Sequence, residues 1–278
     1  MPVPRPLSGY AAYLFDVDGT LVYHDRPVPG AGDALRALKA AGKGVLAVTN
    51  NSSLARHALA ERFRRFALPL DDEEVFSAMV ASAQLIAYEQ PGARVHVFGN
   101  AGLRAEIERV GLVATEEVEA DYLVVGNHRG ITYDRLTTAM RTLLNGARFI
   151  AVNVDRIYVG SDGGLVPGCG VMVAALERAV GRGPDVIVGK PSVTLLHEAA
   201  RSLGQPPSAC LYAGDNPEAD VAGAHAAGMD ALLVLTGVAS TADGAAEQAE
   251  HVLASVADLT AIFEPPSDSA ADVTLRRT

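Results

Sequence analysis

Two aspartates near the N-terminus have a spacing that suits nucleophilic or acid–base chemistry. Asp16 and Asp18 are separated by one residue and followed by Gly19, so a tight turn would hold both carboxyl groups together. One carboxylate can then act as a nucleophile and the other as a proton carrier. A loop cap or an Asx-turn is the simpler interpretation of an isolated pair. An EF-hand is a poor alternative, because its fifth, sixth and twelfth positions would be Thr20, Leu21 and Pro27.

Two segments in the C-terminal half carry groups that could work with these aspartates. Lys190 can neutralise a phosphate and keep a nearby aspartate ionised, although on its own it also fits a solvated loop lysine. Asp215, Asn216 and Asp220 offer the hard oxygen ligands that Mg²⁺ prefers. Asp215 or Asn216 also fits a helix N-cap, because Pro217 follows them. The metal site and the N-cap are compatible with each other.

Apolar runs of strand length alternate with segments of helical periodicity along most of the chain. The predicted strands are Tyr10–Phe15, Gly44–Val48, Arg94–Phe98, Tyr122–Val125, Phe149–Val152, Val186–Val188, Ala209–Ala213 and Ala231–Leu235. The predicted helices are Ala31–Ala41, Leu54–Phe66, Leu103–Val110, Tyr133–Asn145, Val171–Val180, Val193–Leu203 and Glu218–Ala227. This alternation predicts an α/β fold in which helices cover a Rossmann-like parallel sheet.

The polar residues that could do chemistry come directly after predicted strands. Asp16 follows the first strand, Thr49 and Asn50 follow the second, and Lys190 and Asp215 follow two later ones. In an open parallel sheet, ligands bind outside the carboxyl ends of the strands. Four such positions at one edge of a sheet therefore define a candidate site.

The overall charge excludes some classes of partner. The chain has 278 residues, with 33 Asp and Glu against 23 Lys and Arg, and its formal net charge is −10. Two domains are expected at roughly 100–200 residues per domain. The acidic balance argues against a nucleic-acid binder and against a binder of anionic membranes, because both need a basic face.

Cysteine usage and hydropathy indicate a reduced compartment. Cys169 and Cys210 cannot build a disulfide framework, and the seven histidines lack the spacing of a zinc site. Cys169 lies in a glycine-rich segment, where both a redox role and an inert buried thiol are open. Residues 1–9 lack the apolar core of a secretory signal, and no apolar run reaches the ~20 residues of a membrane span. We therefore expect a cytoplasmic protein.

The ordered motifs resemble those of the haloacid dehalogenase (HAD) superfamily of phosphohydrolases. The motifs are Asp16-Val17-Asp18-Gly19-Thr20-Leu21, Thr49-Asn50-Asn51, Lys190, and the segment from Gly214-Asp215 to Asp220. Features typical of the NagD-like (class IIA) branch are Thr49-Asn50-Asn51, Gly189-Lys190-Pro191-Ser192, Asn145-Gly146-Ala147-Arg148-Phe149-Ile150 and Pro167-Gly168-Cys169-Gly170. The resemblance implies a HAD core domain over residues 1–79 and 186–278 and an inserted α/β cap domain over residues 80–185. The composition of the tail from about Glu264 predicts disorder.

The resemblance also implies a two-step phosphoryl transfer. Asp16 would attack phosphorus and form an aspartyl-phosphate. Asp18 would give a proton to the leaving oxygen and then take one from the attacking water. Thr49 and Asn50 would hydrogen-bond the phosphoryl oxygens, and Lys190 would join Asp16 to the phosphate.

A magnesium ion is part of the same implied mechanism. The carboxylates of Asp16 and Asp215 and the main-chain carbonyl of Asp18 would hold the ion, while Asn216 and Asp220 would orient its water. A phosphate dianion repels a carboxylate nucleophile, so a divalent cation and a lysine are needed to cancel that charge.

The resemblance gives the predicted cap the task of selecting the substrate. Asn153, Asp155, Arg156 and Tyr158 are polar residues after a predicted strand that could reach a leaving group. Relatives often have Asn-Pro-Asp where this chain has Asn153-Val154-Asp155, which leaves the identity of the substrate open. We expect a small phosphorylated metabolite as substrate and consider a homodimer through the cap.

Other functions with the same fold are less compatible with the motifs. Dehalogenases of the superfamily lack the second acid, whereas this chain has Asp18. A catalytically silent or regulatory protein that binds phosphorylated metabolites is the alternative from another functional class. Release of phosphate from p-nitrophenyl phosphate would separate an enzyme from such a binder.

Overall fold

Six parallel strands form the first sheet, in the order β15-β14-β13-β1-β4-β5. The strands are β1 (Ala12–Asp16), β4 (Gly44–Thr49), β5 (Val75–Ser77), β13 (Cys210–Gly214), β14 (Asp230–Val234) and β15 (His251–Leu253). The computed structural model describes residues 5–23, 25–160, 163–239 and 248–263. The tail from Glu264, which the sequence predicts to be disordered, lies outside the described residues.

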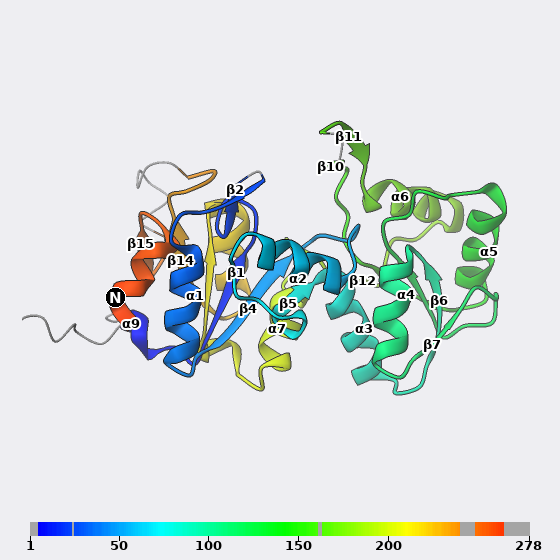
Figure 1. Cartoon of the computed structure of the whole chain (residues 1–278). Coiled ribbons are helices and arrows are strands. Elements are labelled where there is room, and N and C mark those ends of the chain that lie inside the picture. The colour runs from blue at the N-terminus through cyan, green and yellow to red at the C-terminus, as the bar shows by residue number, and fades with distance from the viewer. Residues whose placement is uncertain (1–4, 24, 161–162, 240–247, 264–278) are drawn as a thin grey trace, which may run out of the picture.

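The helices cover both faces of two separate sheets (Figure 1). They are α1 (Ala31–Ala40), α2 (Arg56–Arg65), α3 (Ala78–Glu89), α4 (Ala101–Arg109), α5 (Tyr133–Leu144), α6 (Cys169–Val180), α7 (Thr194–Ser202), α8 (Ala222–Ala226) and α9 (Thr260–Phe263). Successive side chains of β1 point to opposite faces of the first sheet. Tyr13 and Phe15 pack in the same cluster as α1 and α2, whereas Ala12 and Leu14 pack in the cluster of α3, α7 and α8.

Five parallel strands form the second sheet, in the order β12-β9-β8-β6-β7. The strands are β6 (Arg94–Phe98), β7 (Val113–Thr115), β8 (Tyr122–Val125), β9 (Arg148–Ala151) and β12 (Val186–Ile187). Two antiparallel hairpins complete the fold, β2 (Val22–Tyr23) with β3 (Arg26–Pro27) and β10 (Ile157–Val159) with β11 (Leu165–Pro167). We call the first sheet with its helices the first body and the second sheet with its helices the second body.

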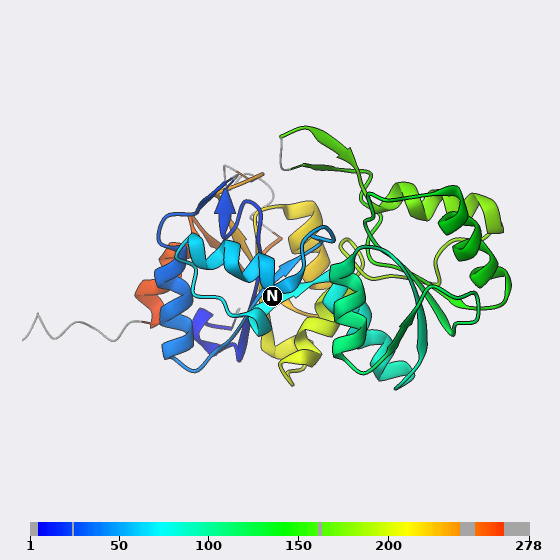
Figure 2. The same ribbon diagram turned by 45° about the vertical axis from the view of Figure 1, so that its right-hand side comes forward.

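The two bodies share one apolar cluster through α3. In Figures 1 and 2, α3 lies between the two sheets. Buried residues of this cluster come from β1 and β4 of the first sheet, from α3, and from β6, β8 and β9 of the second sheet. A separate cluster on the far face of the second sheet joins its strands to α5 and α6.

A buried ion pair also joins the bodies. Arg56 of α2 donates from Nε to Oε1 of Glu106 at 3.1 Å and from Nη2 to Oε2 at 2.9 Å. Both side chains are buried, and Glu106 belongs to α4 of the second body. Arg56 and Glu106 therefore fasten the N-terminal half of the first body to the second body.

The α/β fold class and the parallel sheets predicted from the sequence are confirmed, with one correction. Val186–Val188 was expected in the core domain, but β12 (Val186–Ile187) pairs with β9 in the second sheet. The strands β2, β3, β5, β7, β10, β11 and β15 were not predicted, because each has only two or three residues and shows no measurable period. Within the described chain, no helix combines the length and apolar character of a membrane-spanning segment.

Candidate active site

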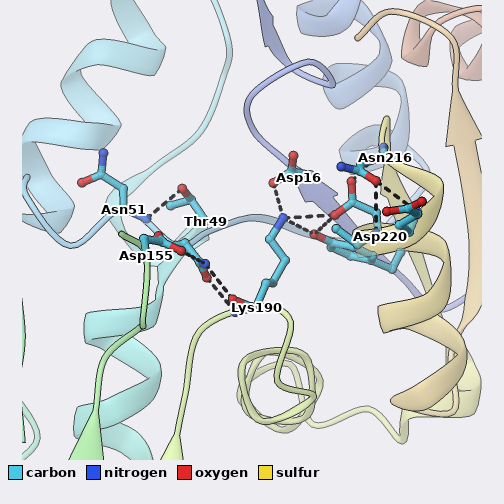
Figure 3. Close-up of polar contacts among 11 residues, drawn as sticks. Asp16, Thr49, Asn51, Asp155, Lys190, Asn216 and Asp220 are labelled. Carbon is cyan, nitrogen blue, oxygen red and sulfur yellow. Dashed lines mark hydrogen bonds and ion pairs between the residues drawn. The ribbon is translucent and has the colours of Figure 1, made fainter. Parts of the chain in front are cut away.

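The site lies where three neighbouring parallel strands end. Asp16 is the last residue of β1, Thr49 is the last residue of β4, and Asp215 directly follows β13. Since β1 is hydrogen-bonded to β4 on one side and to β13 on the other, their polar ends converge at one edge of the first sheet. Figure 3 shows Asp16, Thr49 and Lys190 at this edge.

Lys190 is the central cation of the site. Its Nζ lies 2.6 Å from Oδ1 of Asp16 and 3.1 Å from Oδ1 of Asp220, and it donates to the hydroxyl of Tyr212 at 3.0 Å. Asp16 and Lys190 are both largely buried, with side chains 13% and 16% exposed. Ion pairs this shielded from water are much stronger than surface pairs, so the lysine fixes the orientation of the Asp16 carboxylate.

Burial and charge act against each other on these groups. Burial raises the pKa of Asp16 from its ordinary value to about 7, while Lys190 opposes the rise and Asp220 adds to it. Burial alone would lower the pKa of Lys190, but Tyr212, Asp16 and Asp220 outweigh that effect and hold its pKa well above the ordinary value. The charged form of Lys190 is therefore favoured, and a further cation beside Asp16 would oppose the effect of burial on its pKa.

Three carboxylates form an acidic cluster that fits a hard divalent cation. Asp16, Asp215 and Asp220 each offer an oxygen, and these oxygens lie within 4.8 Å of one another. Oδ2 of Asp215 accepts a hydrogen bond from the main-chain N–H of Val238 at 2.6 Å, and burial raises the pKa of Asp215. Carboxylate oxygens are the ligands that Mg²⁺ prefers, so the residue types and the spacing suit this ion.

The turn after β1 requires glycine. Gly19 has a φ of +86°, in the left-handed region, and a Cβ at this position would collide with the carboxylate of Asp215. The side chain of Asp18, one residue before, is exposed, and Thr236 donates from Oγ1 to the Gly19 carbonyl at 2.6 Å. The side chain of Asp18 is thus accessible to water.

The end of β4 and the loop after it orient the hydroxyl of Thr49 and position Lys190. Oγ1 of Thr49 accepts from the main-chain N–H of Asn51 at 3.1 Å, which leaves the hydroxyl proton of Thr49 able to bind an anion. Asn50 accepts from the Lys190 N–H at 2.7 Å and donates to the Lys190 carbonyl at 3.0 Å. The side chain of Asn50 therefore positions the main chain of Lys190.

Asn216 and Tyr212 have structural partners within the site. Oδ1 of Asn216 accepts from the N–H groups of Glu218 and Ala219, so the N-cap predicted from the sequence is confirmed. The main-chain N–H of Asn216 donates to Oδ2 of Asp220 at 3.1 Å. The sequence does not indicate a role for Tyr212, because a tyrosine within an apolar strand is expected to be a core residue. In the structure its hydroxyl donates to Asp220 at 3.2 Å.

The four substrate-contact candidates of the second body have different surroundings. Asn153 is buried and donates to the Asn50 carbonyl at 2.8 Å, and Asp155 accepts from Nδ2 of Asn50 at 3.4 Å. Burial raises the pKa of Asp155. Tyr158 belongs to the β10–β11 hairpin, and Arg156 is exposed. The structure therefore brings Asn153 and Asp155 to the edge of the first sheet where Asn50 lies, and places Tyr158 and Arg156 further along the loop and hairpin.

Cys169 has the environment of an inert thiol. It is buried, and its Sγ donates to the carbonyl of Val125 at 3.3 Å. Burial raises the pKa of Cys169 to about 12. A thiol so far from ionisation is a poor nucleophile, which favours the structural role over the redox role.

An aspartate paired with a buried lysine at the carboxyl edge of a parallel sheet, beside an acidic cluster, is the arrangement that the sequence motifs predict for a phosphohydrolase. Two family models match the chain, haloacid dehalogenase-like hydrolase over residues 13–113 and HAD-hydrolase-like over residues 187–259. The 5'-nucleotidase YutF of Bacillus subtilis is 40% identical over 84% of this chain and 90% of its own length. The chain therefore belongs to the haloacid dehalogenase-like hydrolases.

Two solved structures support the same placement. The p-nitrophenyl phosphatase from Archaeoglobus fulgidus is 36% identical, with a TM-score of 0.80 over 91% of this chain and 99% of that one. NagD from E. coli K-12 is 29% identical, with a TM-score of 0.79 over 90% of this chain and 98% of that one. The resemblance to the NagD-like, class IIA branch is confirmed, and the protein is a HAD-type phosphohydrolase.

Proposed function

We propose that this enzyme is a Mg²⁺-dependent phosphatase that hydrolyses small phosphomonoesters through an aspartyl-phosphate on Asp16. The observation that carries the proposal is the 2.6 Å contact between Lys190 Nζ and Asp16 Oδ1 beside two further carboxylates. The first body performs the chemistry, and the second body acts as a cap that selects the substrate. A 5'-nucleotidase and a p-nitrophenyl phosphatase among the similar proteins support a phosphomonoester as substrate.

The proposed first step moves the phosphoryl group to Asp16. A carboxylate oxygen of Asp16 attacks phosphorus, and the bond from phosphorus to the ester oxygen breaks with its electron pair on that oxygen. Asp18 gives its proton to the leaving oxygen. Thr49 and Lys190 hydrogen-bond the phosphoryl oxygens, whose charge is greatest in the transition state.

The second step releases phosphate and restores the enzyme. Asp18, now ionised, takes a proton from water as the water oxygen attacks phosphorus. The bond between phosphorus and Asp16 then breaks, and its electron pair returns to the Asp16 carboxylate. Bound at Asp16, Asp215 and the Asp18 carbonyl, with Asp220 and Asn216 next to it, Mg²⁺ would screen the repulsion between phosphate and carboxylates.

The nucleophile is tested by Asp16→Asn, with Asp33→Asn on the exposed face of α1 as the matched control. We expect Asp16→Asn to lower kcat for p-nitrophenyl phosphate by several orders of magnitude, because the amide is not nucleophilic, and Asp33→Asn to leave kcat unchanged. Acid quenching during turnover of ³²P-labelled substrate should trap protein-bound phosphate that hydroxylamine releases. Near-normal turnover by an Asp16→Asn sample free of deamidation would refute the mechanism.

The same samples test the rest of the proposal. Turnover that survives exhaustive EDTA treatment would refute the proposed Mg²⁺ requirement. A protein that binds phosphomonoesters without hydrolysing them would refute the proposed phosphatase activity.

A cytoplasmic location and a homodimer through the second body are also proposed. Large apolar side chains exposed on that body, among them Tyr133, Leu144 and Leu165, support the dimer, which sedimentation would test.

A further inference from the structure

A cavity of about 520 Å³ lies in the second body, beside the catalytic edge of the first. Residues that follow β6 (Gly99, Asn100 and Ala101) and residues that follow β8 (Asn127 to Gly130) form two of its walls. Tyr158 of the β10–β11 hairpin and Ser53 of the first body also line it. This volume is in the usual range for the site of a small metabolite.

The order of the strands explains why a cavity forms at this place. β6 pairs with β7 on one side and with β8 on the other, so the chain leaves β6 in one direction and returns across it to reach β8. Loops that diverge from two adjacent parallel strands leave a crevice at their carboxyl ends. The second body therefore has a ligand crevice of its own, built in the same way as the crevice of the first sheet.

The charge of the cavity is opposite to that of the protein. Arg104, Arg129 and Arg135 line it from three different elements, and Glu116 is the acidic residue among its lining residues. Glu116 lies 3.5 Å from Arg104 and 3.6 Å from Arg135, so one carboxylate is shared between two guanidinium groups. In a chain with a net charge of −10, a concentration of arginine in one crevice attracts an anion.

A buried ring nitrogen in the same wall lacks a hydrogen-bond partner among the described residues. Nε2 of His128 is enclosed, and no hydrogen bond to it is found within the described chain. His128 lies between Asn127 and Arg129 in the loop after β8, and all three line the cavity. A polar atom that is buried without a partner indicates a position where a ligand or a water completes the contacts.

Hydrogen bonds connect this cavity to the proposed phosphate site. Ser53 donates from its N–H to Asn51 at 3.0 Å, and Asn51 donates from its N–H to Thr49. Asn127 of the cavity donates to Oγ of Ser53 at 2.7 Å. Ser53 is four positions after Thr49 in the chain, so their Cα atoms are at most about 14 Å apart. The wall of the cavity formed by Ser53 therefore lies close to the proposed phosphate site.

We propose that the arginine-lined cavity binds a second anionic group, a phosphate or a carboxylate, at the end of the substrate opposite the scissile phosphate. The proposal rests on the proposed phosphatase function and names the substrate class of the same enzyme. Arg129 and Arg135 bind the distal anion, and the charge of Arg104 increases the positive electrostatic potential of the cavity. The enzyme then prefers phosphomonoesters whose leaving group carries its own negative charge.

Three phosphorylated six-carbon compounds related to glucose provide the test. Glucose 6-phosphate has a neutral distal end, 6-phosphogluconate has a carboxylate there, and glucose 1,6-bisphosphate has a phosphate. Each is measured as an inhibitor of p-nitrophenyl phosphate hydrolysis. Each compound then gives an inhibition constant, whether or not the enzyme also hydrolyses it. We expect competitive inhibition, with one or both anionic sugars binding roughly ten- to hundredfold more tightly than glucose 6-phosphate.

The variants Arg129→Gln and Arg135→Gln should reduce this preference about tenfold or more. Arg141→Gln is the matched control, because Arg141 is exposed on the same helix as Arg135 and does not line the cavity. Equal binding of all three sugars, a noncompetitive pattern, or an unchanged preference in both cavity variants would overturn the proposal.

Failure of the proposed function gives a different result. If p-nitrophenyl phosphate is not hydrolysed at all, the phosphatase proposal fails, and isothermal titration calorimetry with the same sugars and variants still decides the charge preference. If hydrolysis proceeds but the sugars bind alike, the phosphatase proposal stands and the cavity proposal is wrong.

Discussion

Removing one partner of the ion pair between Arg56 and Glu106 should destabilise the protein far more than removing one partner of a surface pair of the same helix. Two hydrogen bonds join the side chains, at 3.1 and 2.9 Å, and both groups are shielded from water. Removing one partner of such a pair leaves a buried charge uncompensated, which typically costs about 3–5 kcal/mol. Glu73 also contacts Arg56, but its side chain is 77% exposed, so water screens its charge and it replaces little of the interaction.

We expect Arg56→Met to lower the free energy of unfolding by about 3 kcal/mol, the lower end of that range, because Arg109 still contacts Glu106 at 3.0 Å. Glu106→Leu should cost a similar amount, because it leaves the Arg56 guanidinium buried without its main partner. The double variant Arg56→Met/Glu106→Leu removes both charges and should lose only about 1 kcal/mol, which gives a coupling energy of several kcal/mol.

Urea unfolding followed by circular dichroism measures these changes. Arg64→Met is the matched control, because Arg64 is on the same helix and its pair with Asp72, at 3.3 Å, is exposed. That variant should lose no more than about 1 kcal/mol. The reasoning is refuted if Arg56→Met costs no more than Arg64→Met, or if the double variant loses the sum of the two single losses.

Three further predictions concern the metal, a histidine and a thiol. Mg²⁺ should raise the Tm of the wild-type protein by binding the folded state, and Asp215→Asn should abolish that shift, as differential scanning fluorimetry would show. Burial lowers the pKa of His96 to about 4. As the pH falls, the His96 ring therefore becomes protonated in the unfolded chain at a higher pH than in the folded protein. Stability should therefore fall by about 3 kcal/mol as pH drops from about 6.5 to 4, and His96→Asn should flatten that slope in urea titrations. Cys169 should react with a thiol reagent only upon unfolding, because burial raises its pKa to about 12; reaction of the native protein would contradict this.

The positions of Asp16, Thr49 and Asp215 could be predicted from the sequence because each lies at the end of a long apolar strand of the first sheet, whereas Lys190 follows the two-residue strand β12 of the second sheet. Asp16 and Thr49 end strands that are buried on both faces, and such strands are continuous apolar runs. The parallel arrangement then requires their ends to meet. Tyr212 could not be predicted, because nothing in a strand sequence shows that one hydroxyl extends to Lys190 and Asp220.

The arginine-lined cavity could not be predicted, because its parts are distant in sequence. Arg104 lies on α4, Arg129 follows β8, and Arg135 lies on α5. They converge only because β8 pairs with β6 rather than with β7, and periodicity does not determine strand order. The side-chain role of Asn50 was missed for a similar reason, since its partner Lys190 is 140 residues away.

The path of the chain from β12 to Lys190 limits how this enzyme can be re-engineered. β12 (Val186–Ile187) completes the second sheet, and Lys190, three residues later, contacts the nucleophile of the first. A chimera could take the second body of a relative with its junction at residue 185. Its second sheet would then combine four strands of the relative with the β12 strand of this protein. The junction has to fall between Ile187 and Lys190, where Val188 and Gly189 still donate to carbonyls of the second body. Exchange of specificity between relatives therefore requires transplanting this strand together with the inserted body.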